Sequence, residues 1–424
     1  MTSDALADAA APAGMKPRHV VAVAAGNALE FYDFVTYAYF AVYIGRAFFP
    51  TANPASSLLL ALATFGAGFL TRPIGAIVIG AYGDRAGRKP AMLLSFGLMG
   101  ICIIGMALVP SYARIGLAAP VLVIALRLLQ GFALGGEVGP TTAYLIEAAP
   151  AARRGFYGSL QNATQGVSQL AAGLVGMVLG SLLNAQQVED WGWRLALLLG
   201  AVILPFGLLI RRNLPETHTA QDVARGRERA GDYVREIVLA LLLLASATIA
   251  TYVLNYMTTY ALTTLHMKAG AAFGITAMIG LISVISILWG GRLSDRLGRK
   301  PILLVTKVLL LLLILPGFWI ILGLHTTASF YAVIAVLTAL AQISTALSVV
   351  VVTESLPKSI RSGALAIVYA VAISIFGGST QFVLQWLMNL TRNPMTPAYY
   401  WLGATAVGVV AIVLVKETAP AKLR

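Results

Sequence analysis

The sequence predicts an all-α membrane protein with twelve transmembrane helices arranged as two six-helix halves. Three observations support this fold class. Of the 424 residues, 58% are hydrophobic and only 11% are charged, whereas soluble domains carry about 25% charged residues. Long apolar runs recur along the whole chain, and the same short motifs occur in both halves. The composition therefore argues against a soluble enzyme and against a nucleic-acid-binding protein.

Apolar runs long enough to cross a bilayer supply the predicted helices. A hydrocarbon core of about 30 Å requires about 20 apolar residues in an α-helix. The runs do not alternate between polar and apolar residues, which favours helices over a β-barrel. Charges and Gly/Pro clusters separate twelve such runs, at 19–45, 56–82, 90–110, 116–147, 155–184, 192–211, 236–265, 270–292, 300–323, 328–356, 362–390 and 397–416.

The spans group into two bundles joined by a polar segment. We predict a cytoplasmic, disordered tail at 1–18, a six-helix bundle at 19–211, a cytoplasmic linker at 212–235, a second bundle at 236–416 and a cytoplasmic tail at 417–424. Lys and Arg gather in cytoplasmic loops of membrane proteins. With both termini in the cytoplasm, 22 of the 30 Lys and Arg residues are cytoplasmic, five lie at outer ends and three lie within spans. This distribution predicts the orientation and explains the net charge of +13 without nucleic acid.

Three motifs recur at about half the chain length, which indicates a duplicated six-helix unit. The residues from Gly83 to Pro90 resemble those from Ser294 to Pro301, 211 residues further on. The spacing E-x2-P-x3-R occurs at Glu147, Pro150 and Arg154 and again at Glu354, Pro357 and Arg361, and the pair Glu-Thr occurs at 216–217 and 417–418.

These repeats resemble the major facilitator superfamily of transporters. The pattern G-x-x-x-D-R-x-G-R-[RK] after span two is that superfamily's signature, and it occurs here after spans two and eight. Parallel repeats around an axis along the membrane normal are the architecture of this fold. The resemblance covers nearly the whole chain and implies two pseudo-symmetric halves that alternate access to a central site.

The signature loops predict a cytoplasmic gate between the halves. Asp84 and Asp295 would lie at helix ends, where they can accept hydrogen bonds from Arg and from helix N-terminal amides across the interface. A simpler alternative is that the basic residues of these loops only set the orientation. The candidate gate residues are Asp84, Arg85, Arg88, Glu147, Arg154, Asp295, Arg296, Arg299, Glu354 and Arg361.

Span one carries two carboxylates on one helical face. Asn27, Glu30 and Asp33 are spaced i, i+3, i+6 and share that face. Repulsion between the two carboxylates in a low dielectric would keep one of them protonated, as a proton carrier requires. The alternative is a structural pair neutralised by Arg72 or Arg127.

Two arginines are predicted to lie within the membrane. Arg72 precedes Asp84 by 12 residues, so it lies about 18 Å from the cytoplasmic loop and needs a carboxylate from the protein or from a substrate. In span four, Arg127, Gln130 and Glu137 fall within one arc of the helix. The sequence R-x-x-Q-G resembles the superfamily's fourth-helix motif, whose Arg is linked to proton coupling. Ion pairs with neighbouring helices are the structural alternative.

Spans five and eleven add uncharged polar side chains. Gln161 and Gln165 share one face of span five, and Tyr369 and Gln381 lie in span eleven. They can hydrogen-bond to a polar solute, or they can join helices to one another. Lys307 in span nine can reach the interface with its long side chain.

The combined motifs narrow the resemblance to the metabolite–proton symporters. The pattern G-N-x-x-E-x-Y-D-F in span one, R-P-x-G in span two and the span-four residues carry it. Known members carry citrate, tricarballylate, α-ketoglutarate, shikimate, or proline and glycine betaine, and span eleven looks most like the carboxylate carriers. The resemblance thus implies proton-coupled import of citrate or a related carboxylate. The candidate substrate contacts are Asn27, Tyr32, Arg72, Arg127, Gln161, Gln165, Tyr369 and Gln381, and the candidate proton sites are Glu30, Asp33 and Glu137.

Other classes find less support in the sequence. No G-x-x-x-x-G-K-[ST] motif is present for a nucleotide-driven pump, and the four His and single Cys102 show no metal-ligand spacing. Span five lacks the proline of many exporters, and a non-transporting sensor stays an alternative. We therefore expect no enzymatic activity, no metal and no cofactor beyond a coupling proton. We expect a monomer in a bacterial inner membrane that binds a small organic anion and no nucleic acid.

Overall fold

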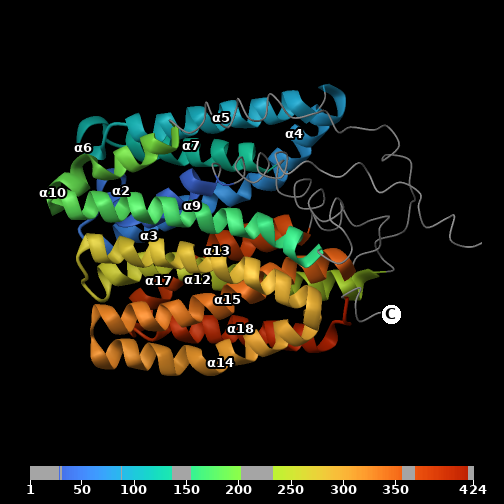
Figure 1. The fold of residues 1–424 in the computed structure, drawn as a ribbon. Coiled ribbons are helices and arrows are strands. Elements are labelled where there is room, and N and C mark those ends of the chain that lie inside the picture. Colours follow the sequence, from blue (N-terminus) through green and yellow to red (C-terminus); the bar gives the residue numbers. More distant parts are fainter. Residues whose placement is uncertain are drawn as a thin grey trace, which may run out of the picture.

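The computed structural model describes residue 28 and residues 31–86, 88–135, 154–201, 233–355 and 368–418. Helices fill these segments, and no strand occurs in them. The helices run side by side, with the blue-to-green half above the yellow-to-red half in Figure 1.

The first half begins with a helical run at 31–39. It continues through α2 (Ala41–Phe48), α3 (Pro54–Leu70), α4 (Arg72–Ala86), α5 (Arg88–Leu108), α6 (Tyr112–Ile115), α7 (Ala118–Leu134), α9 (Arg154–Leu182), α10 (Ala185–Gln187) and the π-helical turn η3 (Val188–Gly192), and then a helical run at 193–201.

The second half consists mainly of long helices. They are α12 (Val234–Thr263), α13 (Ala269–Leu297), α14 (Arg299–Leu324), α15 (Thr327–Ser355), a helical run at 368–372, the π-helical turn η5 (Ile373–Gly377), α17 (Gly378–Thr391) and α18 (Thr396–Leu414).

The structure confirms the predicted all-α membrane fold. Every one of the twelve predicted spans contains helix in its described part, and eight described helices are long and apolar enough to cross a bilayer. Large apolar side chains such as Ile77, Leu117 and Leu182 are 72–78% exposed on the outside of the bundle. A hydrocarbon environment rather than water accounts for such exposure.

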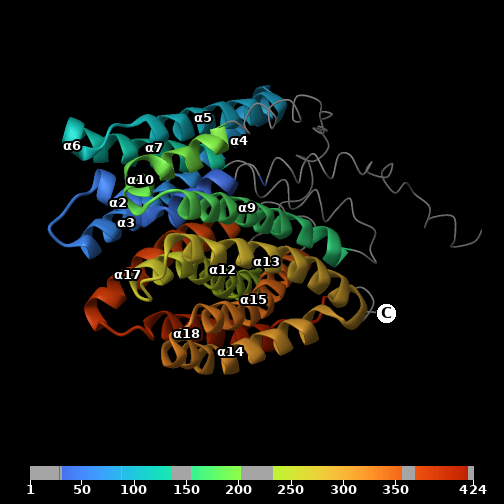
Figure 2. The ribbon, with the colours of Figure 1, turned by 60° about the vertical axis from the view of Figure 1, so that its left-hand side comes forward.

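The two halves meet along α9 and α13, which lie next to each other in both views (Figures 1 and 2). Small residues make this approach close, because a Cβ at Gly280 would overlap the backbone of Leu170 in α9. Small residues at helix contacts in a bilayer let backbones approach and gain dispersion energy. The second contact between halves joins α3 to α17, with Gly66 against Gly378.

Span two breaks between α3 and α4, and the break places Arg72 inside the bundle. Thr71 ends α3, and Pro73 follows Arg72 at the start of α4. Proline lacks the backbone N–H of a helix interior and interrupts the ladder of hydrogen bonds. The Thr71 hydroxyl donates instead to the carbonyl oxygen of Leu128 in α7, at 2.6 Å.

The described helices have two ends that differ in charge. We call the end that carries Asp295 the inner end, because the basic residues predict it to be cytoplasmic, and the opposite end the outer end. These two terms are used below.

Candidate functional site

A small cavity lies between the two halves at the middle of the spans. Its volume is about 50 Å³, room for one or two water molecules at about 30 Å³ each. Both halves contribute to its wall, which consists of Phe31, Phe34, Val35, Arg72, Asn162, Gln165, Gln169, Leu244, Ala247, Thr248, Thr251, Tyr252, Asn255, Thr345, Val349, Tyr369 and Ile373. A larger solute therefore requires the halves to move apart.

Arg72 is the one charged residue in the described wall of this central cavity. Its guanidinium lies 4.7 Å from the ring centre of Phe34 and 4.4 Å from that of Phe69. Its Nε has no hydrogen-bond partner in the described part of the chain. A buried guanidinium held by aromatic faces, with a donor left over, is suited to an anionic acceptor.

Amide side chains of α9 lie beside Arg72. Asn162, Gln165 and Gln169 all face the cavity, and Asn162 Nδ2 has no partner among the described residues. Tyr369 lines the same cavity, and its hydroxyl lies within hydrogen-bonding reach of Gln161 and Gln165. The predicted face of span five and the predicted Tyr369 thus come together at one point.

Helix α12 contributes part of the cavity wall, and none of its residues is among the candidate site residues predicted from sequence. Thr248, Thr251, Tyr252 and Asn255 face the cavity from this helix. Asn255 Oδ1 accepts hydrogen bonds from Gln169 Nε2 at 2.5 Å and from the Tyr39 hydroxyl at 3.2 Å, which ties α12 to the first half. The spacing i, i+3, i+4, i+7 of the four residues is the signal that identifies this face.

Asp33 and Arg127 are joined through Gln130 rather than in a direct ion pair. The Gln130 amide donates to Asp33 Oδ2, and its oxygen accepts from Arg127 Nη1. All three side chains are at most 1% exposed. Arg127 is also surrounded by aromatic rings, with the Tyr37 ring centre 4.2 Å away.

The described part of span four, up to Gly135, lies behind the cavity, whereas the sequence analysis expected this span to contribute to the site. Arg127 and Gln130 are not in the cavity wall, because Phe34 and Phe65 stand beside Arg127. The arginine in the cavity wall is Arg72 of span two. The packing of α7 explains this arrangement, since a Cβ at Gly131 would overlap the backbone of Gly68 in α3.

Two further predicted substrate contacts also lie outside the cavity wall. The Tyr32 hydroxyl donates to the carbonyl oxygen of Ala196 at 3.0 Å, within the first half. Gln381 is 1% exposed, and neither its Nε2 nor its Oε1 has a partner in the described part of the chain. Gln161 is equally buried, one helical turn from Gln165.

Several predicted site residues fall outside what the structure describes. These are Asn27, Glu30, Glu137, Glu147 and Arg361. The backbones of four others are helical, but their side chains are outside the description: Asp84, Arg85, Arg88 and Arg154.

Four residues form a polar cluster at the inner end, which we call the inner cluster: Asp295, Arg299, Glu354 and Glu417. Asp295 accepts hydrogen bonds from the backbone N–H groups of Gly155 and Phe156, at 2.9 and 3.1 Å. These N–H groups open α9, so the carboxylate of one half binds the N-terminus of a helix in the other half. This is the contact that the sequence motif predicts for Asp295.

The rest of the inner cluster holds the second half together. Arg299 lies 2.8 Å from Asp295 and 3.3 Å from Glu354. Glu417 accepts from the backbone N–H groups of Arg299 and Lys300 at the start of α14. Arg296 is exposed on α13 and contributes none of these contacts.

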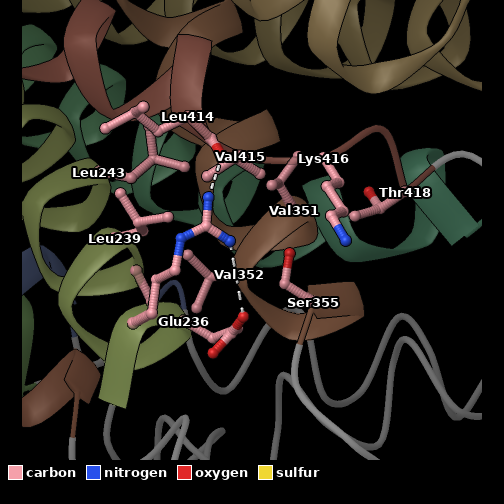
Figure 3. A pocket seen from close by; sticks show the side chains of 12 residues that line it. Glu236, Leu239, Leu243, Val351, Val352, Ser355, Leu414, Val415, Lys416 and Thr418 are labelled. Atoms are coloured by element: carbon pink, nitrogen blue, oxygen red, sulfur yellow. Dashed lines mark hydrogen bonds and ion pairs between the residues drawn. The ribbon is translucent and has the colours of Figure 1, made fainter. Parts of the chain in front are cut away.

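A separate cavity of about 170 Å³ lies at the inner end of α12, α15 and α18 (Figure 3). Arg235 donates to the carbonyl oxygen of Leu414 at 3.2 Å and lies 3.9 Å from Glu236. Apolar side chains, among them Leu239, Val351 and Val352, complete the wall. These contacts join helix ends within the second half, away from the interface between halves.

The described wall of the central cavity is partly polar. It offers a guanidinium, amides and hydroxyls as donors, and its described wall contains no carboxylate. No group of three or more His, Cys, Asp or Glu residues that could hold a metal occurs among the described residues.

Comparison with known proteins decides the family. The model of the Major Facilitator Superfamily matches residues 35–380. The chain belongs to this superfamily. It is therefore a multi-pass membrane transporter and not an enzyme, and the resemblance inferred from the signature loops is confirmed.

Curated relatives are secondary transporters. The chain is 33% identical to a citrate-proton symporter of Klebsiella pneumoniae over 92% of this chain and 90% of the relative. It is 35% identical to the alpha-ketoglutarate permease of Escherichia coli K12 over 93% and 92%. It is 31% identical to that organism's proline/betaine transporter over 97% and 85%.

Solved structures show the same fold. A crystal structure of a D-xylose-proton symporter superimposes with a TM-score of 0.75 at 19% identity, over 95% of this chain and 98% of the other. The E. coli xylose transporter XylE in a partially occluded inward-open conformation superimposes with a TM-score of 0.74 at 17% identity, over the same shares. At this identity the likeness concerns the fold alone.

Proposed function

We propose that the protein imports a small organic anion, citrate or a related di- or tricarboxylate, together with protons. The observation that carries this proposal is Arg72, the single cation in a cavity whose described wall has no carboxylate. A carboxylate can accept from the Arg72 guanidinium, whose Nε has no described partner, and from Asn162 beside it. The name of the Klebsiella pneumoniae relative supports the same substrate class.

Asp33 is the proposed proton site within the described part. Its carboxylate is fully buried, and Oδ1 has no partner among the described residues. A carboxylate in the membrane with an incomplete set of donors is suited to bind and release a proton. Protonation removes the negative charge from the acceptor of the Gln130 amide, so it weakens the chain from Asp33 through Gln130 to Arg127 and lets span four move relative to span one. Glu30 and Glu137 complete the proposed proton sites.

The proposed transport cycle is alternating access. The halves separate at one end to admit the anion to the central cavity and at the other end to release it. At the inner end, Asp295 holds α9 in the closed state, and opening exchanges its two backbone partners for water. The other proposed gate residues are Asp84, Arg85, Arg88, Glu147, Arg154, Arg299, Glu354 and Arg361, whereas the exposed Arg296 is left out of the gate.

The proposal includes the setting in which transport occurs. Both termini lie in the cytoplasm of a bacterium, because the basic residues favour that orientation. One chain forms a complete pathway in the inner membrane, since both halves contribute to one cavity. The proton is the coupling ion, and no further cofactor takes part.

Uptake of radiolabelled citrate into proteoliposomes under an inward proton gradient tests the proposal. Accumulation that a protonophore abolishes supports proton-coupled import. Unlabelled α-ketoglutarate, tricarballylate, shikimate and proline identify the preferred substrate by competition. Absence of uptake for every one of these solutes contradicts the proposal and favours an exporter or a sensor.

A zwitterion such as glycine betaine is the second candidate. Four aromatic residues, Phe31, Phe34, Tyr252 and Tyr369, lie in the cavity wall, and aromatic faces bind quaternary ammonium groups. The guanidinium of Arg72 repels such a group, which is why the anion is preferred. Uptake of labelled glycine betaine that unlabelled citrate does not inhibit would reverse this order.

A further inference from the structure

The outer end of the second half carries only basic and imidazole side chains. Three loops lie there, at 264–268, 325–326 and 392–395, and their ionisable residues are His266, Lys268, His325 and Arg392. Between Glu236 and Glu417 the only acidic residues of the sequence are Asp295 and Glu354, both in the inner cluster. Lys and Arg remain more numerous at the inner end of this half, as the orientation rule requires, but the three outer loops carry basic or imidazole side chains with no carboxylate in the same loops.

Three of these side chains surround one cavity, which we call the outer vestibule. It has a volume of about 950 Å³ and is lined by Thr263, Thr264, Leu265, His266, Met267, Ile321, Leu322, His325, Thr326, Thr327, Met388, Arg392, Asn393 and Pro394. Hydroxyls, amides, imidazoles and one guanidinium make up its polar wall. The described wall has no carboxylate, and its one permanently charged group is the Arg392 guanidinium.

The backbone holds these three residues in an unusual conformation. His266, His325 and Arg392 have φ of 49°, 52° and 51°, and they are the only non-glycine residues with positive φ in the described part of the chain. Glycine or asparagine usually occupies such a position at a helix C-terminus. The strain is tolerated at three separate loops that meet at one cavity, which is typical of a binding region.

A ladder of polar side chains leads from the outer vestibule toward the central cavity. Gln385 Nε2 donates to the exposed Asn389 at 2.8 Å, and Gln385 Oε1 accepts from the buried Tyr256 hydroxyl at 2.7 Å. The Tyr256 hydroxyl also lies 3.3 Å from Met388 Sδ in the vestibule wall. The ladder ends at Tyr256, and Asn255, the preceding residue of α12, lines the central cavity with its side chain bonded to Gln169 and Tyr39.

We propose that the outer vestibule is a reception site for organic anions, in which His266, His325 and Arg392 bind carboxylate groups before the anion enters the central cavity. A cleft lined by one sign of charge raises the local concentration of counter-ions about 10- to 1000-fold. The inference rests on the proposed function for the identity of the anion. The vestibule's preference for anions can be measured without transport.

A single introduced cysteine measures the potential in the vestibule. The one native cysteine, Cys102, is buried, so Thr327→Cys in the full-length protein adds one accessible thiol to the vestibule wall. Its rates with an anionic and a cationic methanethiosulfonate reagent are compared, each divided by the rate of a free small thiol. We expect the anionic reagent to be favoured about tenfold or more, and citrate to slow the reaction more than sodium chloride of equal ionic strength.

Asparagine substitutions separate charge from backbone. His266→Asn, His325→Asn and Arg392→Asn together remove the donors, and asparagine tolerates positive φ. We expect the normalised rates of the two reagents to become equal within about twofold, because the vestibule wall then has neither the guanidinium nor the two imidazoles. Arg114→Gln, an exposed cation at the outer end of the first half, is the matched control and should change nothing.

Transport supplies the second readout. The triple variant should raise the KM of the transported anion about tenfold, with the maximal rate retained, since the vestibule concentrates substrate without taking part in translocation. Equal reagent rates in the parent, or an unchanged preference in the triple variant, overturns the inference. Failure of the parent to transport any organic anion refutes the proposed function instead, and the reagent preference still decides whether the vestibule binds anions.

Discussion

Removal of the Asp295 carboxylate should open the inner end of the protein. Asp295 contributes the two hydrogen bonds that join α13 of the second half to the N-terminus of α9 in the first. Its bond to Arg299 lies within the second half, so we expect that bond to be kept in both states and to leave the opening equilibrium unchanged. Asp295→Ala therefore perturbs the closed state in particular.

The size of the effect follows from those two bonds. A hydrogen bond to a charged group contributes about 1.5–3 kcal/mol net, and we take the lower value because water reaches the inner end. Two bonds then give about 3 kcal/mol, and each 1.4 kcal/mol is a factor of about ten. Asp295→Ala should raise the open-to-closed ratio about 100-fold, and Asp295→Asn, which keeps one acceptor oxygen, about tenfold.

Accessibility of the central cavity provides the assay. Thr248→Cys places a thiol in the cavity wall, and the native Cys102 is buried. A membrane-impermeant thiol reagent is added to inside-out vesicles, where it meets the inner end. Asp295→Ala should accelerate labelling up to about 100-fold, until the open state predominates.

A matched variant makes this test specific. Arg296→Ala removes an exposed charge from the same helix end, without a contact to α9, and should leave labelling unchanged. Unchanged labelling in Asp295→Ala, with the temperature of thermal unfolding preserved, would refute the assignment of Asp295 to the gate.

Four further predictions follow from the site. Asp33→Asn should abolish uphill uptake and leave citrate counterflow; loss of both, or of neither, argues against a coupling role. Arg72→Gln should raise the KM for citrate at least about tenfold, with Arg72→Lys intermediate because it keeps the charge without the planar fork; an unchanged KM removes Arg72 from the binding site. Gly131→Val should destabilise the protein by about 1–3 kcal/mol, measured by thermal unfolding, because its side chain meets the backbone of α3; full stability would contradict the close contact. Gln381→Leu should raise the unfolding temperature, because it removes buried unpartnered atoms, and lower uptake if the amide binds substrate; a lower unfolding temperature would show a structural partner.

The fold could be predicted from sequence because its signals are local and repeated. Hydropathy identifies each span, because a run of about 20 apolar residues matches the length of a helix that crosses the bilayer. The duplicated motif around Asp84 and Asp295 gives the two halves, and it also predicts the contact between Asp295 and backbone amides at the start of α9. The grouping of Gln165 and Tyr369 follows from helical spacing once the spans are known.

The position of each arginine could not be predicted in the same way. Both Arg72 and Arg127 are buried cations near the middle of their spans, and the sequence gives them equal weight as substrate contacts. Only the packing of Gly131 on α3 and the break before Pro73 determine that Arg72 reaches the cavity and Arg127 lies behind Phe34. These are contacts between helices, which hydropathy does not report.

The residues of the polar face of α12 are absent from the candidate site residues for a different reason. Thr248, Thr251 and Tyr252 are weakly polar, and they lie in a helix that is otherwise rich in leucine and alanine. Their helical spacing is visible in the sequence, but the same spacing also fits interhelical contacts. The structure distinguishes a cavity-lining surface from an interhelical contact, because these residues lie in the cavity wall.

Simultaneous recording of citrate and proton movement tests the central claim most directly. Citrate is added outside proteoliposomes that contain a pH-sensitive dye, with no gradient imposed beforehand. The account predicts that labelled citrate enters and that the lumen acidifies with it, and that Asp33→Asn vesicles preloaded with unlabelled citrate exchange it for labelled citrate without acidification. Entry of citrate into wild-type vesicles with no change in internal pH would contradict proton symport.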